Sequence, residues 1–550
     1  MTDQNTLLSV EALELGVSGM PEQRIVRGVG FEIRPGEMVG LVGESGSGKT
    51  MLGRAIIGLQ PGGIVGLGGT IRLRGRDLSQ MSPSELRKMR GEEVSIVFQE
   101  PMTSLNPSMT IGRQLDEPLR THTKLGYVER RARILAMMER VGIPSPADRL
   151  SDYPHEFSGG MRQRIMLASA MLLKPALLIA DEPTTALDAL VQREVLELMV
   201  EMTRENATAL ILISHDLPMV ARYCERIMVM RRGELVEQGE TPQILAKPTH
   251  DYTRKLLAAM PERGPLRRFD AEETPLVELR NLKVEYVSRG GLLSRVSRTL
   301  ALKGASLSVR RGEVVAVVGA SGSGKTTLGR ALAHLIPHSA GEILFRGQPV
   351  RRGNKGWMDF RLNCQMIFQD PFGSLDPRFT IRRALAEALY HMDLGTEEKD
   401  TRIRRIVAEV GLDEEHLDRL PHEMSGGQRQ RVAIARAIIS EPDFVIADEA
   451  VSALDVTVRA QVLDLLADLQ KRHGFSCLFI SHDLGVVEQM ADRVVVMRDG
   501  EIVEEGLRDR IFDAPESSYT RALLSAIPTL KRTGEGVELN WRFAVPEANA

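Results

Sequence analysis

Two stretches of the sequence have the residue types and spacing of a loop that binds phosphate groups. The first is Gly43-Glu44-Ser45-Gly46-Ser47-Gly48-Lys49-Thr50, and the second is Gly319-Ala320-Ser321-Gly322-Ser323-Gly324-Lys325-Thr326. In this pattern the glycines let the backbone curl so that successive N–H groups point at phosphate oxygens. The lysine can reach the β and γ phosphates, and the threonine can ligate Mg²⁺. The alternative, a turn that binds nothing, is weakened because the pattern recurs.

A pair of acidic residues follows an apolar run in two places. Asp181 and Glu182 follow the run 176–180, and Asp448 with Glu449 follows the run 444–447. A buried strand that delivers two acids to a site explains both pairs. The aspartate would hold Mg²⁺ through water, and the glutamate would orient or deprotonate an attacking water molecule. A strand that ends in solvated acids is a common alternative for one copy and a poor one for two.

Other polar residues follow further predicted strands. His215 comes after the run 209–213, and His482 repeats it. A neutral histidine there can hydrogen-bond a γ phosphate and the catalytic water, although a satisfied histidine would better explain one isolated copy. Gln99 and Gln369 also follow apolar runs and can ligate Mg²⁺, but alone they are weak evidence.

Two serine-glycine-glycine stretches precede amphipathic helical patterns. They are Ser158-Gly159-Gly160 and Ser425-Gly426-Gly427, the latter followed by Gln428. A serine and two glycines at a helix start form a second anion site. Within one module this loop duplicates the job of the phosphate loop, so it makes sense if it closes over nucleotide held by the other module.

Alternating strands and helices must position these residues. A buried strand over 38–42 precedes the first phosphate loop, and a helix over 51–59 follows it. The pattern predicts a parallel-sheet core with covering helices. Alternating residues at 276–279 and 282–284 predict an antiparallel β subdomain, and helical insertions are expected over about 110–152 and 380–420. The predicted class is α/β, with two tandem phosphate-loop domains.

The chain is a duplication. Ser425 lies 267 positions after Ser158 (425 − 158 = 267), and the same offset relates His215 to His482 and Tyr252 to Tyr519. We expect a first domain over 1–261, a short charged linker over 262–274 and a second domain over 275–530. The tail, 531–550, carries no assignment.

Composition bounds the function. The 550 residues exceed one core, and the net charge of −3 gives no global basic field for nucleic acid. No apolar run approaches the roughly 18–20 residues that span a bilayer, and no basic region leads a signal-peptide core at the N-terminus. We therefore expect a cytoplasmic chain.

The three cysteines, Cys224, Cys364 and Cys477, lack metal-ligand spacing, so we expect buried thiols without a disulfide or an iron–sulfur cluster.

This motif order, present twice, resembles the ATP-binding subunits of ATP-binding-cassette (ABC) transporters over nearly the whole chain. Ala186-Leu187-Asp188 and Ala453-Leu454-Asp455 belong to the same set. The resemblance implies ABC-type domains, ATP and Mg²⁺, and a pseudo-dimer within one chain. Each ATP would lie between the phosphate loop of one module and the Ser-Gly-Gly signature of the other. The resemblance also implies two groups of site residues. The catalytic group is Glu182, His215, Glu449 and His482, and the metal group is Thr50, Gln99, Asp181, Thr326, Gln369 and Asp448.

Further short motifs resemble those of the dipeptide/oligopeptide/nickel importer branch of this family. They are Gln99-Glu100-Pro101, Gln369-Asp370-Pro371, the Pro-His-Glu at Pro154 and Pro421, Gly290-Gly291-Leu292-Leu293, and a terminal Tyr-Thr-Arg segment over 252–261 and 519–528. We expect the terminal segments to be structural or regulatory and to pack through Leu256-Leu257 and Leu523-Leu524.

The sequence departs from the family pattern in places. Met161 replaces the usual signature glutamine. Tyr286 resembles the aromatic residue that stacks on adenine, but its equivalent in the first module is Val17, so the first site is expected to bind ATP more weakly. Some relatives carry a cysteine cluster that binds an iron–sulfur centre after the terminal segment. Here no cysteine follows Pro261 within the end of the first module or the linker, and none follows Pro528.

The resemblance implies two integral-membrane permeases and an extracytoplasmic substrate-binding protein as partners, no nucleic acid, and a peripheral location at the cytoplasmic face of the plasma (inner) membrane. It implies an ATPase that powers import, with peptide as the expected cargo and nickel, glutathione or oligosaccharide as alternatives. A soluble twin-cassette ATPase acting on ribosomes or DNA is the other alternative. The short linker and the lack of zinc-type cysteine pairs argue against it.

Overall fold

The computed structural model describes residues 6–99, 104–184, 187–267, 269, 274–288, 297–354, 356–451, 454–533 and 536–540. These residues fall into two compact units. The first unit draws on Met1–Ala258 and Ile527–Trp541, and the second on Ala259–Ala526 and Arg542–Ala550. Several motif residues lie outside the described part of the chain, namely Glu100, Pro101, Ala186, Ala453 and the stretch 290–293.

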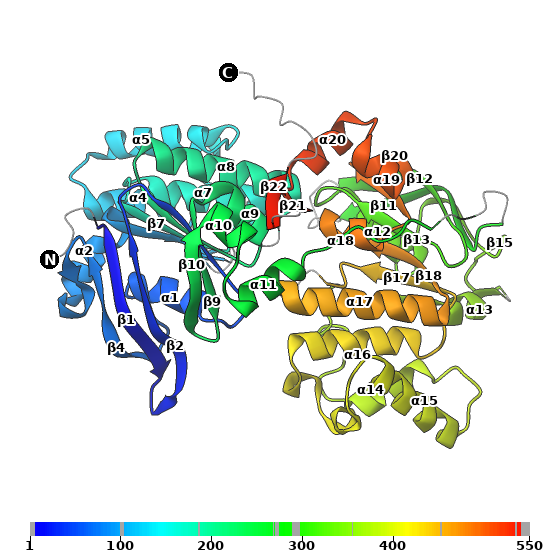
Figure 1. Cartoon of the computed structure of the whole chain (residues 1–550). Coiled ribbons are helices and arrows are strands. Elements are labelled where there is room, and N and C mark those ends of the chain that lie inside the picture. The colour runs from blue at the N-terminus through cyan, green and yellow to red at the C-terminus, as the bar shows by residue number, and fades with distance from the viewer. Residues whose placement is uncertain are drawn as a thin grey trace. The chain divides into compact units, whose positions relative to one another are not determined.

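The described part of the first unit contains two main sheets (Figure 1). The antiparallel sheet, in the order β2-β1-β4-β5, consists of β1 (Leu8–Val17), β2 (Met20–Ile33), β4 (Ile64–Leu73) and β5 (Arg76–Asp77). The central sheet, in the order β10-β9-β3-β8-β7-β6, consists of β3 (Met38–Val42), β6 (Val94–Val97), β7 (Leu177–Asp181), β8 (Ala209–Ser214), β9 (Arg226–Arg231) and β10 (Glu234–Glu240). All its pairings are parallel except that of β10 with β9. The carboxyl ends of β3, β7 and β8 therefore meet at one edge.

The helices of the first unit cover these sheets and add a helical subdomain. They are α1 (Lys49–Ile56), α2 (Pro83–Glu92), α4 (Ile111–His122), α5 (Tyr127–Arg140), α6 (Pro146–Arg149), α7 (Gly159–Met171), α8 (Ala189–Glu205), α9 (Leu217–Tyr223), α10 (Thr241–Ala246) and α11 (Asp251–Ala258). Short 3₁₀ turns lie at Leu78–Gln80 and Pro154–Glu156. Helices α4, α5 and α7 pack on one another, which confirms the helical insertion expected over 110–152.

The helix after the first phosphate loop begins earlier than the sequence predicted. We expected a helix over 51–59, whereas α1 spans Lys49–Ile56. Gly48 stands at the N-cap with φ 99°, a left-handed conformation that favours glycine, so the helix starts at the next residue. Gly58, with φ 66°, follows the C-terminal end.

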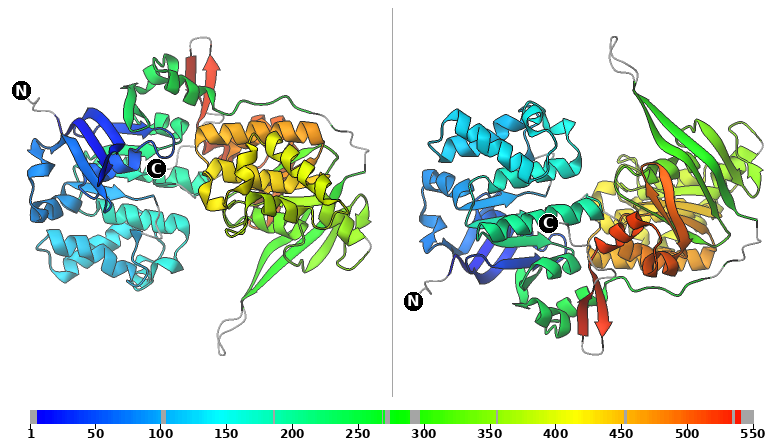
Figure 2. Two further views of the ribbon diagram at one scale, coloured as in Figure 1. Left: turned by 90° about the horizontal axis from the view of Figure 1, so that it is seen from below. Right: turned by 90° about the horizontal axis from the view of Figure 1, so that it is seen from above.

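The second unit repeats this plan. Its antiparallel sheet, in the order β12-β11-β14-β15, consists of β11 (Val277–Ser288), β12 (Ser297–Val309), β14 (Ala340–Phe345) and β15 (Gln348–Pro349). Its central sheet, in the order β16-β17-β18-β13-β19-β20, consists of β13 (Val314–Val318), β16 (Cys364–Ile367), β17 (Phe444–Asp448), β18 (Ser476–Ile480), β19 (Arg493–Arg498) and β20 (Glu501–Leu507). Both views in Figure 2 show β11 and β12 as a long ribbon that stands out from the rest of this unit.

The helices of the second unit follow the order of those in the first, with a 3₁₀ turn in place of α6. They are α12 (Lys325–Leu332), α13 (Gly356–Asn363), α14 (Ile381–Ala388), α15 (Thr396–Glu409), α16 (Gly426–Ile438), α17 (Val456–His473), α18 (Leu484–Met490), α19 (Arg508–Asp513) and α20 (Ser518–Ser525), with 3₁₀ turns at Glu414–Asp418 and Pro421–Glu423. Helices α14, α15 and α16 pack together as the second helical subdomain, and α17 lies against α16. Figure 1 shows α14, α15, α16 and α17 in this arrangement.

In each unit one core joins the antiparallel sheet to the central sheet. In the first unit, Leu8 and Ile33 share a buried cluster with Leu52 of α1 and Ile179 of β7. The second unit repeats this with Val277 and Val309, Leu328 and Ile446. The central strands read as continuous apolar runs because both faces of the sheet are covered, one of them by the antiparallel sheet together with α1 or α12.

The C-terminal residues form a hairpin that belongs to the first unit. Strands β21 (Thr529–Thr533) and β22 (Gly536–Asn540) pair in an antiparallel ladder. Strand β22 lies against α10 and α9 of that unit. The described part of the tail, which carried no assignment from the sequence, thus completes the first unit.

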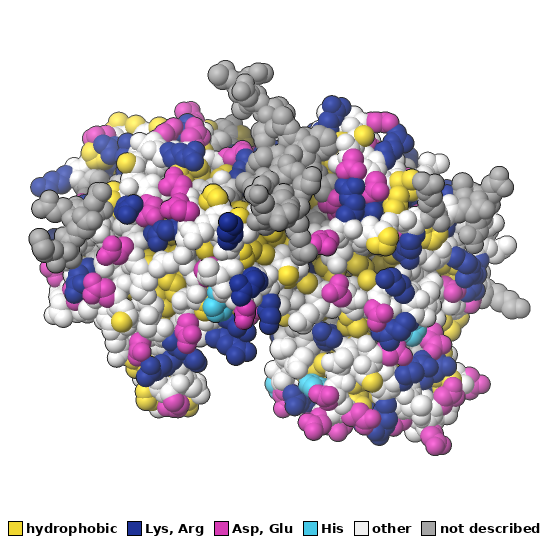
Figure 3. Space-filling view, in the orientation of Figure 1, with side chains coloured by type: hydrophobic (Ala, Val, Ile, Leu, Met, Phe, Trp, Pro, Cys, Tyr) yellow, Lys and Arg dark blue, Asp and Glu magenta, His cyan; other side chains and the backbone are white. Residues whose placement is uncertain are grey.

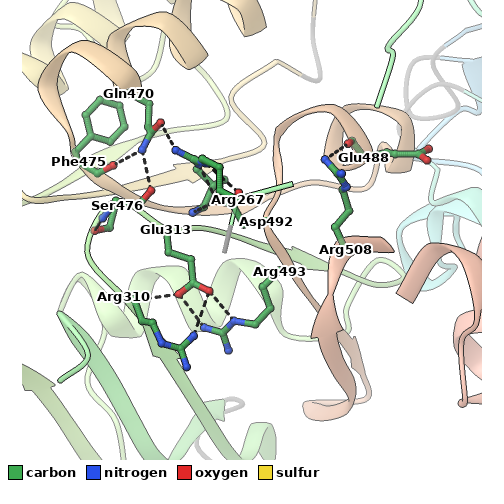
Figure 4. A network of polar contacts seen from close by, with 12 residues as sticks. Arg267, Arg310, Glu313, Gln470, Phe475, Ser476, Glu488, Asp492, Arg493 and Arg508 are labelled. Carbon is green, nitrogen blue, oxygen red and sulfur yellow. Dashed lines mark hydrogen bonds and ion pairs between the residues drawn. The ribbon is translucent and has the colours of Figure 1, made fainter. Parts of the chain in front are cut away.

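Described linker residues are held on the second unit by ion pairs. Arg263 contacts Glu488 and Asp513, and Arg267 forms a two-pronged contact with Asp492 at 2.7 and 3.0 Å. Figure 4 shows Arg267 turned toward Asp492 and Gln470. Asp492 is 2% exposed and also accepts the N–H of Val314, where β13 begins. The linker is therefore attached at the base of the central sheet.

The surface of each unit mixes charges of both signs. On the face shown in Figure 3, Lys and Arg side chains are interspersed with Asp and Glu side chains. Across the described residues, the helices are all too short or too polar to cross a membrane.

Replacing Arg267 by alanine is expected to lower the free energy of unfolding of the second unit by about 1–3 kcal/mol, because it leaves the buried carboxylate of Asp492 without its charged partner. Thermal unfolding of the full chain measures the change. The matched control is Arg280→Ala, which removes an exposed ion pair with Glu278 and should cost less than about 1 kcal/mol. Equal losses for the two variants would contradict the role of Arg267 as the partner of the buried Asp492.

Candidate functional site

The two phosphate loops have nearly the same backbone shape. Gly43 has φ 155°, and a Cβ at this position would lie 2.2 Å from the carbonyl oxygen of Met230 at the end of β9. In the second unit Gly319 has φ 150°, and its Cβ would lie 2.1 Å from the carbonyl oxygen of Met497. Only glycine fits so close to another backbone, so the loop is held against the central sheet.

The lysine of each loop curls back over it. Lys49 Nζ donates hydrogen bonds to the carbonyl oxygens of Gly43 and Glu44, both at 2.8 Å. Lys325 Nζ makes the same two contacts with Gly319 and Ala320, also at 2.8 Å. Both lysines are buried. An ammonium group held over a curl of backbone N–H groups at a helix start is suited to bind phosphate oxygens.

A threonine–aspartate pair joins each loop to the neighbouring strand. Thr50 Oγ1 donates to Asp181 Oδ1 at 3.0 Å, and Thr326 Oγ1 lies 3.2 Å from Asp448 Oδ1. Burial at the strand end raises the pKa of Asp181, and the hydrogen bond from Thr50 opposes that rise. The pKa of Asp448 is raised for the same reasons. Hydroxyl and carboxylate oxygens are the ligands that Mg²⁺ takes together with phosphate groups, so the pair fits this ion.

The glutamate after each aspartate lies between a glutamine and a histidine. Glu182 Oε2 accepts from Gln99 Nε2 at 3.0 Å, and its Oε1 lies 3.4 Å from His215 Nδ1. Glu449 has the same neighbours at 2.7 and 3.3 Å, namely Gln369 and His482. Burial would raise the pKa of Glu449, but the hydrogen bond and charge of His482 outweigh it and leave that pKa below its usual value. Such a carboxylate can accept a proton or a hydrogen bond from water.

Both glutamates have an uncommon backbone conformation. Glu182 has φ 45° and Glu449 has φ 47°, which is the left-handed region. The N–H of each donates to the neighbouring strand, to the carbonyl of Ile213 near the end of β8 or of Ile480 at the end of β18. Residues held in this region cost about 1–3 kcal/mol and gather at functional sites. No pattern in the sequence predicted this conformation.

The histidine is presented by a tight turn after its strand. Ser214 Oγ accepts the N–H of Asp216 at 3.0 Å, and the Asp216 carboxylate caps α9 by accepting the N–H of Met219 at 3.0 Å. The serine and the aspartate thus fix the turn, and His215 between them points to Glu182.

The Ser-Gly-Gly loops begin helices, as predicted. Ser158 Oγ accepts the N–H of Met161 at 3.3 Å, and Ser425 Oγ accepts that of Gln428 at 3.3 Å. The second glycine has a packing role that the sequence did not reveal. A Cβ at Gly160 would lie 2.5 Å from Val191 of α8, and at Gly427 it would lie 2.6 Å from Val458 of α17. Gly159 and Gly426 have more room.

The expected adenine-stacking residue lies near its phosphate loop. Tyr286 on β11 is 45% exposed, and its hydroxyl lies 3.4 Å from Thr327 Oγ1, next to Thr326. In the first unit Val17 is the last residue of β1 and pairs with Met20 at the hairpin end. The ribbon of the second unit continues further, so the difference between the two sites is one of strand length as well as side chain.

Two further tyrosines contact the phosphate loops and were not predicted to do so. Tyr252 and Tyr519, in the terminal segments, accept backbone N–H groups of the loops through their hydroxyls. Leu256, Leu257, Leu523 and Leu524 are buried, as expected.

The three cysteines are free thiols, and burial raises the pKa of each.

Comparison with known proteins gives a consistent picture. The family described as "ABC transporter" matches residues 26–185 and 302–452. The family described as "Oligopeptide/dipeptide transporter, C-terminal region" matches residues 236–282 and 503–542. The chain is 45% identical to the peptidoglycan transport ATP-binding protein YejF of Agrobacterium fabrum, over 96% of this chain and 97% of that protein. It is 43% identical to the glutathione import ATP-binding protein GsiA of Escherichia coli O157:H7, over 96% of this chain and 90% of that protein.

Asp181→Asn is expected to stabilise the chain in the absence of nucleotide and magnesium. Because the folded-state pKa of Asp181 is raised, its contribution to stability falls as pH rises from the unfolded value through the folded pKa. At pH 7.5 the amide should raise the melting temperature, and the gain should shrink as pH falls toward 4.

Thermal melts at several pH values measure this effect. Glu234→Gln, an exposed position on β10, is the control and should leave the melting temperature unchanged at every pH. A gain for Asp181→Asn that grows toward acid pH would contradict the raised pKa.

Proposed function

Since this chain belongs to the ABC transporter family as an ATPase with two ATP-binding cassettes, we propose that it powers an importer for peptides or peptide-like molecules. The observation that carries the proposal is the extension after each cassette, which matches the C-terminal region of oligopeptide and dipeptide transporters. The relatives named for peptidoglycan transport and glutathione import support the same cargo class, because both cargoes contain peptide bonds.

The residues of each cassette have distinct roles in this proposal. The phosphate-loop N–H groups with Lys49 or Lys325 would hold the phosphates of ATP, and Thr50 with Asp181, or Thr326 with Asp448, would hold Mg²⁺, with Gln99 or Gln369 beside them. Mg²⁺ supplies charge neutralisation for the transferred phosphoryl group. Glu182 and Glu449 would orient the attacking water and accept its proton, while His215 and His482 hold each carboxylate in place.

The proposal pairs the phosphate loop of one cassette with the Ser-Gly-Gly loop of the other. The first ATP would be completed by Ser425, Gly427 and Gln428, and the second by Ser158, Gly160 and Met161. The chemical support is that a capped helix start, such as that of the Ser-Gly-Gly loop, binds anions. Within one cassette the phosphate loop already binds the phosphates, so the Ser-Gly-Gly loop would serve the ATP held by the other cassette. Tyr286 would add a stacking face for adenine in the second site only.

Transport then requires membrane partners. We propose two permeases and an extracytoplasmic substrate-binding protein, with the chain bound peripherally to the permeases at the inner membrane. ATP-driven closure of the cassettes would move the permeases between inward and outward openings. The alternative is a soluble twin-cassette ATPase that acts on ribosomes or DNA.

Glu182→Gln and Glu449→Gln are expected to lower turnover at their own sites by about 10²–10⁴-fold, because a positioned base is lost. Each single variant should keep no more than about half of the phosphate release, and the double variant almost none. ATP affinity should be a few-fold to tenfold weaker at the first site, which lacks the tyrosine face.

Exposed glutamates at equivalent places in the repeat serve as controls. Glu234 lies on β10 and Glu501 lies on β20, and replacing either by glutamine should not change phosphate release. If either Glu182→Gln or Glu449→Gln left turnover unchanged, that site would not be hydrolytic and the two-site proposal would fail.

Import is tested by co-expression with any permease pair that is encoded beside this gene. One copy of the chain is expected per permease pair, because fusion makes cassette pairing intramolecular at roughly millimolar effective concentration. Uptake of a labelled dipeptide, tripeptide, glutathione or peptidoglycan fragment should require the chain, and the double glutamine variant should assemble without transport. Copurification with ribosomes or DNA in place of permeases would overturn the proposal in favour of the alternative.

A further inference from the structure

A tyrosine in each terminal extension reaches the phosphate loop of its own cassette. Tyr252, the second residue of α11, accepts a hydrogen bond at its hydroxyl from the N–H of Glu44 at 3.0 Å. Tyr519 in α20 accepts one from the N–H of Ala320 at 2.9 Å. The two loop residues differ in side chain, so the contact depends on the backbone of the loop alone. Its recurrence in both units makes an accidental contact a poor explanation.

The strand that presses against the loop also fixes the tyrosine ring. The guanidinium of Arg231, the last residue of β9, lies 4.9 Å from the ring centroid of Tyr252. Arg498, at the end of β19, lies 5.1 Å from the ring of Tyr519. The residue before each arginine supplies the carbonyl that approaches Gly43 or Gly319. Loop, strand end and tyrosine thus form one packed group in each cassette.

The helix that carries the tyrosine is anchored to the edge of the central sheet. Glu237 on β10 accepts the N–H groups of Thr249 and His250 at 2.7 and 3.1 Å, just before α11. Glu504 on β20 accepts those of Glu516 and Ser517 at 2.7 and 3.1 Å, just before α20. The position of each hydroxyl is therefore set by the extension and the sheet, not by the loop that it contacts.

We infer that Tyr252 and Tyr519 are positioning residues for ATP binding, through which the peptide-transporter extension sets the conformation of the phosphate loop. This rests on the proposed role of the loops in holding ATP. The hydroxyl keeps the second N–H of the loop in a fixed direction, and so the curl that presents the other N–H groups is formed before nucleotide arrives. Preorganised donors bind an anion without an ordering cost at the moment of binding.

A purely structural role would need only the buried ring, which Tyr→Phe retains. Tyr252→Phe, Tyr519→Phe and the double variant are therefore made in the full chain, in the Glu182→Gln, Glu449→Gln background for binding and in the native background for turnover. The affinity for a fluorescent ATP analogue is expected to fall about three- to tenfold at the altered site. The KM for ATP should rise by a similar factor, while kcat at saturating ATP changes less than twofold.

Hydrogen exchange provides a readout that is independent of activity. Without nucleotide, the backbone amide hydrogens of peptides that cover 39–52 should exchange faster in Tyr252→Phe, and those of peptides that cover 315–328 should exchange faster in Tyr519→Phe. The exchange rates of the remaining strands of the central sheet should not change. The second cassette supplies an independent variant if the first fails to fold. Tyr127→Phe on α5, where the tyrosine is 65% exposed, is the control and should match the unaltered chain in every measurement.

The lysine variants separate this inference from the proposed function. Lys49→Ala with Lys325→Ala should abolish binding of the analogue. If they do and the phenylalanine variants bind as the unaltered chain does, with unchanged exchange of both loops, the inference is wrong and the proposed function stands. If the lysine variants bind normally, the assignment of the loops as the ATP sites fails, and the inference fails with it.

Discussion

The rest of each site depends on the hydrogen bond between the phosphate-loop threonine and the aspartate at the end of the neighbouring strand. Thr50 and Asp181 are 131 residues apart, and their contact joins the start of α1 to the end of β7. A carboxylate that is 1% exposed requires such a partner, because burying a charge without one is costly. Glu182 follows β7 directly, so the contact that fixes the end of this strand also helps to place Glu182.

The duplication separates what the site requires from what it tolerates. Loop geometry, the threonine–aspartate bond and the glutamate with its glutamine and histidine recur with distances within 0.3 Å of each other. Some half-buried residues differ between the two copies, as Glu44 and Ala320 do, or Met161 and Gln428. Backbone groups and buried polar pairs therefore carry the shared chemistry, and the two sites can differ in nucleotide affinity without a change in mechanism.

The sequence predicted most of the site because its residues follow buried strands. Apolar runs that end in Asp181, Ser214 or Gln99 place polar residues at one edge of a parallel sheet by topology alone. The tyrosine contacts were not predictable in this way. Tyr252 and Glu44 are 208 residues apart and share no pattern, so only the folded chain brings them together. The left-handed glutamates and the need for Gly160 beside Val191 are likewise properties of packing, not of spacing.

Fusion of the cassettes gives each unit a segment from outside its own repeat. The hairpin of β21 and β22 follows the second cassette in sequence but lies on α10 and α9 of the first unit. The linker arginines, which follow the first cassette, lie on the second unit, where Arg267 covers Asp492. The position equivalent to Asp492 in the first cassette is Glu225, which is exposed. A buried carboxylate with an arginine from the linker is thus specific to the second cassette. The two cassettes are therefore more than independent domains joined by a linker. Deleting the linker would remove contacts from the second unit, and deleting the hairpin after the second cassette would remove contacts from the first.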